Sequence, residues 1–178
     1  MSDLLLAACT VTLVAWQLTG VADWLMHRRT RIESTSGVRE AAFHLAMLVQ
    51  MGSFFLALLW LPAGALVLGA CIALLVLHEL TVYADLRWAV ARRKVSALEQ
   101  LIHSAQEFLP LVALALLAAA AWQAPEQARL SPLGTSLPVN VVVALHVAGA
   151  ALFLLYAEEL WRCLRADAGQ PAAPHAGR

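Results

Sequence analysis

Five long apolar segments restrict the fold of this 178-residue chain more than any other feature of its sequence. They cover about residues 4–29, 37–61, 63–93, 97–122 and 138–165. A helix needs about 20 mainly apolar residues to cross a bilayer, and each segment is long enough. Within a bilayer the backbone must satisfy its own hydrogen bonds, which helices do. The pattern predicts an all-α, polytopic membrane protein with five transmembrane helices.

The composition agrees with a membrane location. Hydrophobic residues make up 61% of the chain and charged residues only 13%, whereas a soluble domain carries about a quarter charged residues. Twelve basic residues balance twelve acidic ones, so no nucleic-acid partner is expected. Cys9, Cys71 and Cys163 lie in apolar surroundings without a CxxC pair, and we expect buried thiols.

Local signals mark where the helices begin, bend and end. Pro62 favours a tight turn, and Ser96 followed by Glu99 matches a capping box at a helix start. Pro110 predicts a kink. The first segment lacks a preceding basic residue and a cleavage site, so a retained helix is expected. We expect one transmembrane domain, residues 1–165, followed by a disordered tail, residues 166–178.

Basic residues concentrate in alternate connections, which predicts the orientation. The connection near Arg129 has one basic residue and the turn at Pro62 has none. Ten others lie at the other ends of the segments: Arg28, Arg29, Arg31, Arg39, Arg87, Arg92, Arg93, Lys94, Arg162 and Arg165. Because such residues favour the cytoplasmic side, we expect an inner (plasma) membrane protein with its N-terminus outside and its C-terminus in the cytoplasm.

Acidic residues and histidines of the apolar segments gather on that same expected side, and His146 alone lies apart. Glu158 and Glu159 are interpreted mainly as an interfacial pair, and their part in a site is left open. The candidate metal ligands are Asp23, His27, Glu40, His44, His78, Glu79, Asp85, Glu99, His103 and Glu107. Such groups are costly in an apolar interior unless they have partners or a bound ion.

The spacing of these residues favours a shared metal site. Residues four apart lie on one helix face, as do residues seven apart. Four segments bring a carboxylate and an imidazole together in this way: Asp23–His27, Glu40–His44, His78–Asp85 and Glu99–His103, with Glu107 one turn further. Mixed oxygen and imidazole ligands suit iron, manganese or zinc. Metal ions are therefore the expected cofactors, two iron ions first, with zinc or manganese as alternatives.

This ligand chemistry resembles that of the di-iron carboxylate enzymes built in four-helix bundles. Those enzymes use Glu-x-x-His, whereas this chain has Asp/Glu-x-x-x-His, and it lacks the HxxxH and HxxHH boxes of membrane desaturases. The stretch from His78 to Pro110 also resembles small uncharacterised bacterial inner-membrane proteins, which implies no activity. The first resemblance implies that the first four helices form an antiparallel bundle around the polar site.

Several functions fit these observations. The preferred one is a membrane metalloenzyme at the cytoplasmic leaflet that oxidises, hydroxylates or desaturates a lipid-like substrate. Alternatives are a zinc-dependent lipid hydrolase, a haem-b electron carrier ligated by residues such as His44 and His103, and a metal or proton transporter. A redox partner or a homo-oligomer is left open. Without a metal, Asp23 and Asp85 could pair with Arg28 or Arg87, and Glu99 could serve only as a cap.

Overall fold

The computed structural model describes residues 3–62, 64–123 and 131–169, and within them it is all-helical. Its long helices are α1 (Asp3–Thr30), α2 (Gly37–Trp60), α3 (Ala65–Ala89), α4 (Ala97–Gln123) and α5 (Val139–Ala168). Two short 3-10 helices, η1 (Ile32–Ser34) and η3 (Leu133–Thr135), lie in the connections. All five long helices are long and apolar enough to cross a membrane, which confirms the predicted fold class. Of the expected tail, 166–168 belongs to α5 and 170–178 lies outside the described residues.

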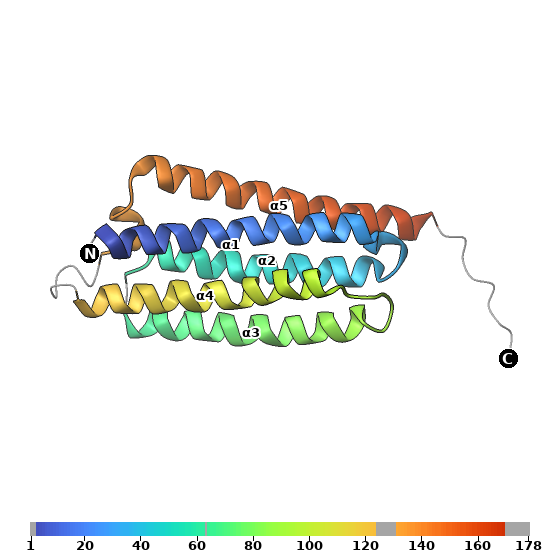
Figure 1. Ribbon diagram of the computed structural model, residues 1–178, viewed down its shortest axis with the longest axis horizontal. Helices are drawn as coiled ribbons and strands as arrows, with labels where there is room; N and C mark the ends of the chain where they lie inside the picture. Colours follow the sequence, from blue (N-terminus) through green and yellow to red (C-terminus); the bar gives the residue numbers. More distant parts are fainter. Residues whose placement is uncertain (1–2, 63, 124–130, 170–178) are drawn as a thin grey trace, which may run out of the picture.

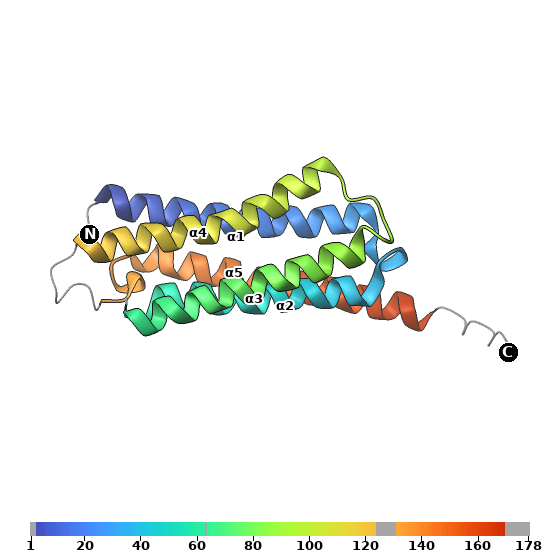
Figure 2. The same ribbon diagram turned by 90° about the horizontal axis from the view of Figure 1, so that it is seen from below.

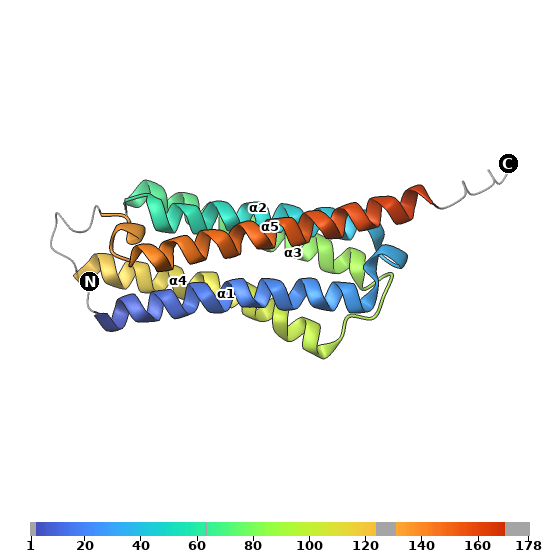
Figure 3. The same ribbon diagram turned by 90° about the horizontal axis from the view of Figure 1, so that it is seen from above.

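The helices run up and down along one long axis, and consecutive helices are antiparallel (Figure 1). α1 packs against α4 and α5, and α2 packs against α3 and α5. The packing order is therefore α4–α1–α5–α2–α3, as Figures 2 and 3 show from two sides. α5 lies between α1 and α2, so the bundle includes a fifth helix that the expected four-helix arrangement left out. Among the described residues, α3 and α4 are not a closely packed pair.

An aromatic and aliphatic core fills the half of the bundle that contains the N-terminus. Trp16 of α1 meets Phe54 and Phe55 of α2 edge-on, with ring centroids 5.9 and 6.4 Å apart. Leu13 and Leu58 are almost fully buried in the same cluster. Many other large apolar side chains face outward, as expected for helices surrounded by lipid. This core leaves few polar groups in that half.

The predicted helix signals have clear structural counterparts. The Glu99 N–H donates to Ser96 Oγ at 3.2 Å, and the Ser96 N–H donates to Glu99 Oε2 at 3.4 Å, which confirms the capping box. α4 continues through Pro110 and bends along its length, as Figure 2 shows. α3 ends at Ala89, four residues before the expected end. The residues after Ala89 turn back toward the bundle, and Arg93 contacts Glu40 of α2 and Glu99 of α4.

We expect Gly134→Ala to lower the melting temperature of the detergent-purified protein. A Cβ at Gly134 would lie 2.9 Å from the backbone oxygen of Leu59, which cannot move without shifting the end of α2. The expected loss is about 1–3 kcal/mol of unfolding free energy. The matched control is Gly69→Ala, because a Cβ there meets open space in a helix and should be neutral or stabilising. Equal melting temperatures for both variants would contradict this packing.

Candidate metal centre

Seven of the ten candidate ligands converge at the end of the bundle that contains η1 and the turn between α3 and α4. They come from α1, α2, α3 and α4. Six of them are buried and His103 is partly buried. The seven are Asp23, His27, Glu40, His44, Asp85, Glu99 and His103. The helical spacing predicted which residues share a helix face, and in the bundle these faces of α1, α2, α3 and α4 meet.

One carboxylate of α5, Glu159, holds two of the imidazoles. Its Oε2 lies 3.2 Å from His27 Nδ1 and its Oε1 lies 2.6 Å from His44 Nδ1. The two rings stack almost parallel, with centroids 4.1 Å apart and an interplanar angle of 8°. Because an ionised carboxylate only accepts hydrogen bonds, both rings must carry their proton on Nδ1. In the neutral form of each ring, Nε2 then carries a lone pair that could bind a metal ion.

Both Nε2 atoms face carboxylate oxygens without a hydrogen-bond partner. His27 Nε2 lies 3.3 Å from Asp23 Oδ1 and 3.7 Å from Glu99 Oε1. The corresponding atom of His44 has two carboxylate neighbours of its own. Asp85 Oδ2 lies 3.5 Å from His44 Nε2, and Glu40 Oε1 lies 3.8 Å from it. A neutral Nε2 lone pair facing carboxylate oxygens is repulsive unless a proton or a metal ion lies between them.

Asp23 connects the third imidazole to α5. His103 Nε2 lies 2.9 Å from Asp23 Oδ1, and the Tyr156 hydroxyl donates to Asp23 Oδ2 at 2.9 Å. The same hydroxyl lies 3.2 Å from the carbonyl oxygen of Gly20. Asp23 is therefore fixed by contacts from α4 and α5 as well as by its own helix. Its expected partner Arg28 instead pairs with Glu158, at 3.4 Å.

Arg93 closes the outer end of the cluster. Its Nε donates to both carboxylate oxygens of Glu40, at 3.1 and 3.2 Å, and its Nη2 lies 2.5 Å from Glu99 Oε1. Burial opposes the charge of this guanidinium, but its hydrogen bonds to Glu99 and Glu40 outweigh burial and raise its pKa above the usual value. Arg93 therefore stays charged and neutralises part of the acidic cluster.

Two groups of side chains have a geometry that could hold metal ions. Ligand atoms of Asp23, His27 and His103 lie within 4.8 Å of one another, and so do ligand atoms of His27, Glu40 and His44. Ligand bonds of about 2.0–2.2 Å place neighbouring ligand atoms about 2.8–3.6 Å apart in tetrahedral or octahedral sites. Asp23 Oδ1 lies 2.9 Å from His103 Nε2 and 3.3 Å from His27 Nε2, within this range, and the 3.8 Å between His44 Nε2 and Glu40 Oε1 lies slightly beyond it.

Asp85 and Glu99 belong to the cluster but to neither of these groups, and three further expected ligands lie outside the cluster altogether. Beside the cluster lies a cavity inside the bundle. His78 is buried in its wall, and Glu107 is half-buried in the same wall. Glu79 is exposed and close enough to Glu107 for an electrostatic interaction. All three belong to α3 or α4, the two helices that lack close mutual packing.

The interpretation of Glu159 as an interfacial residue is wrong, because its side chain is fully buried. Glu158 does lie near the surface, where Trp24 Nε1 donates to it at 3.2 Å. The sequence carries a signal that separates these neighbours. Buried positions of α5 recur at three- and four-residue steps, and Glu159 belongs to this stripe whereas Glu158 does not. The stripe comprises Leu152, Tyr156, Glu159 and Cys163.

His146 is occupied by structural contacts far from the cluster. Trp60 Nε1 donates to His146 Nε2 at 3.0 Å, and His146 Nδ1 donates to the carbonyl oxygen of Val142 at 2.8 Å. Both ring nitrogens are therefore satisfied, as expected for a helix-packing histidine.

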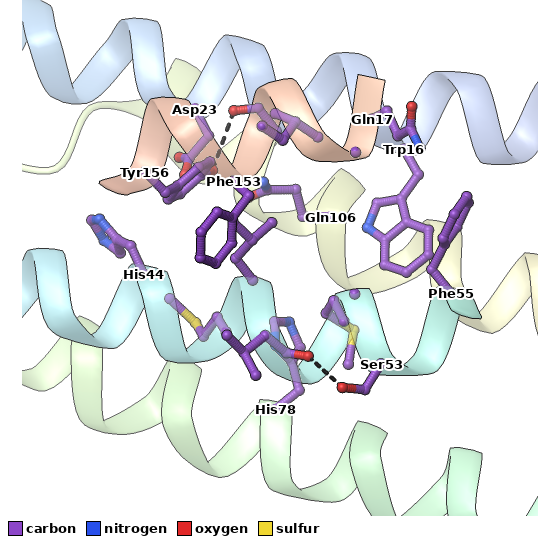
Figure 4. Close-up of a pocket in the computed structure, with 18 of the residues that line it drawn as sticks. Trp16, Gln17, Asp23, His44, Ser53, Phe55, His78, Gln106, Phe153 and Tyr156 are labelled. Atoms are coloured by element: carbon purple, nitrogen blue, oxygen red, sulfur yellow. Dashed lines mark hydrogen bonds between the residues drawn. The ribbon is translucent and has the colours of Figure 1, made fainter. Parts of the chain in front are cut away.

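A cavity of about 400 Å³ leads from the cluster into the middle of the bundle. Figure 4 shows Asp23, His44 and Tyr156 toward one end of it and Trp16 and Phe55 toward the other. All five helices contribute to its wall, most of which is apolar. Ligand sites in proteins have this character: a largely apolar pocket with a few polar groups at defined positions.

Comparisons of the chain with protein-family models, with curated proteins and with solved structures find no match. The assignment of a function therefore depends on the geometry of the cluster and the cavity.

We expect Glu159→Gln to destabilise the protein by about 1–3 kcal/mol, because an amide presents one acceptor where two imidazole N–H groups need acceptors. The control is Glu158→Gln, a half-exposed neighbour whose loss should change stability by less than about 1 kcal/mol. Thermal unfolding in detergent measures both. A melting temperature for Glu159→Gln equal to that of Glu158→Gln would show that Glu159 does not hold the two rings.

Proposed function

We propose that the chain is a membrane metalloenzyme whose histidine–carboxylate cluster binds two divalent cations and oxidises a lipid-like substrate from the adjacent cavity. One observation carries the metal proposal. Two parallel imidazoles are held through Nδ1 by the same carboxylate, and their Nε2 atoms face further carboxylates with no hydrogen-bond partner. Histidines that ligate metals are commonly oriented in this way, with the second ring nitrogen bound to a carboxylate.

The ring stacking supports a pair of ions. The centroids of His27 and His44 are 4.1 Å apart in nearly parallel rings that share an orienting group. Each ring would offer its Nε2 to one ion. Two-metal centres hold their ions about 3.5–4 Å apart. His27 belongs to both ligand groups, so its Nε2 would bind one ion together with Asp23 and His103, and the other ion would take Glu40 and His44.

The net charge of the cluster also supports two divalent cations. Five buried carboxylates face one buried guanidinium, which leaves four negative charges when the histidines are neutral. Two divalent cations supply four positive charges. The carboxylates are Asp23, Glu40, Asp85, Glu99 and Glu159. Protonation of all three imidazoles would still leave one negative charge in an apolar interior, which is costly.

The ligand types favour iron, with manganese or zinc as the other cations of suitable chemistry. Iron in such a site would supply the oxidising chemistry, with dioxygen as the oxidant. The protein would exclude bulk water, orient the ligands and present the substrate through the apolar cavity. His103 and Asp23 also line this cavity, so a bound molecule would lie beside the proposed ions. Zinc would instead favour hydrolysis.

The other two functions receive less support. A haem ligated by His44 and His103 needs two nitrogens facing a macrocycle, but these atoms face carboxylates. A transporter needs polar groups through both halves of the bundle, and the other half is filled by the core around Trp16 and Phe54.

For orientation, we propose that the metal centre lies at the cytoplasmic leaflet. Most basic residues lie at the same end of the bundle as the cluster, because η1, the α3–α4 turn and the end of α5 are all at that end (Figure 1). The positive-inside rule places this end in the cytoplasm.

We expect His103→Ala to remove at least half of the metal bound per chain, because His103 belongs to one of the two ligand groups. Mass spectrometric metal analysis of the detergent-purified protein should give two ions per wild-type chain. His146→Ala is the matched control, since this histidine contacts Trp60 and should leave the metal content unchanged. Size-exclusion chromatography reports whether each variant remains folded. Full occupancy in folded His103→Ala, or a wild-type protein without metal, would favour a structural ion-pair network instead.

The orientation can be tested with cysteines at the two ends. Ser131→Cys should react in intact cells with a membrane-impermeant maleimide, and Ser34→Cys should react only after lysis, because the two exposed serines lie at opposite ends of the bundle. The native cysteines are buried and should give little background. The reverse labelling pattern would place the cluster at the outer leaflet.

A further inference from the structure

Away from the proposed metal ligands, the cavity wall carries a buried polar atom that has no hydrogen-bond partner. His78 of α3 has a buried Nδ1 with no hydrogen-bond partner, and only 6% of the residue is exposed. Figure 4 shows its ring in the cavity wall, on the opposite side from Asp23 and Tyr156. A buried imidazole nitrogen without a partner is unfavourable by about 1–3 kcal/mol. The position therefore calls for a ligand with a hydrogen-bonding group inside the membrane.

The other residues of the cavity wall indicate what kind of molecule would bind next to His78. Trp16, Phe55, Phe153 and Tyr156 give the cavity aromatic walls, which suit a flat ring. A saturated acyl chain would fill the space but would leave Nδ1 of His78 without a partner. A ring that carries oxygens on opposite edges could meet His78 on one side and the polar cluster on the other.

We propose that the cavity binds the ring of a membrane quinone or its quinol, with one ring oxygen hydrogen-bonded to His78. The second oxygen faces the end of the cavity that contains His103 and Asp23. The hydrocarbon tail leaves between α3 and α4, the two neighbouring wall helices that are not closely packed within the described residues. This inference rests on the proposed function for its choice of a redox substrate, but ring binding itself needs no metal.

One glycine allows the cavity to be filled without disturbing the fold, and a second glycine provides the control. Gly52 of α2 lines the cavity, and a Cβ there meets no atom within 4 Å. A leucine at this position would occupy the space of the ring. Gly69 of α3 also meets open space but is exposed on the bundle surface, so Gly69→Leu is the matched control. His78→Leu removes the proposed hydrogen bond and keeps an apolar side chain of similar size.

The test uses full-length protein in detergent and a decyl-tailed azidobenzoquinone as a photoaffinity probe, with labelled peptides identified by mass spectrometry. We expect labelling within 44–56 of α2 and 78–86 of α3, competed by decylbenzoquinone but not by palmitate. Gly52→Leu should weaken labelling at least tenfold and His78→Leu about tenfold, while Gly69→Leu should stay within twofold of wild type.

Three results would overturn the proposal: labelling spread over outward-facing positions, equal losses in Gly52→Leu and Gly69→Leu, or equal competition by palmitate, which would identify an acyl chain as the occupant. Repeating the labelling on chelator-treated protein separates the two proposals. Unchanged labelling of a protein that binds no metal would leave the quinone site standing and remove the metalloenzyme. Two metals per chain without cavity labelling would support the metal centre and rule out the quinone site.

Discussion

The desolvation of five carboxylates determines how this end of the bundle is built. Each charge would be strongly unfavourable alone in an apolar interior, and their mutual repulsion adds to this. Arg93 leaves the end of α3 and turns inward, and three histidines place ring nitrogens against the remaining oxygens. The negative charge that remains is the basis of the proposal that the cluster binds cations.

Glu159 links this electrostatic requirement to the arrangement of the helices. Its two oxygens contact His27 of α1 and His44 of α2, so one side chain sets the separation of three helices. Tyr156, one turn earlier, adds a second contact to α1 through Asp23. The aromatic core around Trp16 positions the same helices at the other end. The stacked rings are consequently held between two fixed regions, as a preorganised ligand set requires.

The sequence was sufficient for the five helices because apolar length is a local property. It was also sufficient for most of the cluster, because residues four apart on a helix share a face whatever the tertiary structure. It did not place Glu159 correctly, since the choice between two adjacent glutamates depends on the rotation of α5 within the bundle. Arg93 was counted only for orientation, because its inward turn depends on where α3 ends. His78, Glu79 and Glu107 fell outside the cluster because α3 and α4 do not pack closely.

That separation of α3 and α4 explains why polar residues remain there at all. In a fully packed bundle, His78 and Glu107 would need protein partners or would be unfavourable beside lipid. They instead line the wall of a cavity that reaches the histidine–carboxylate cluster through His103, one turn from Glu107. A loosely packed pair of helices with hydrogen-bonding groups, next to an oriented set of ligands, has the properties of a substrate path. The residues that contribute least to packing are therefore the ones most suited to recognising what enters.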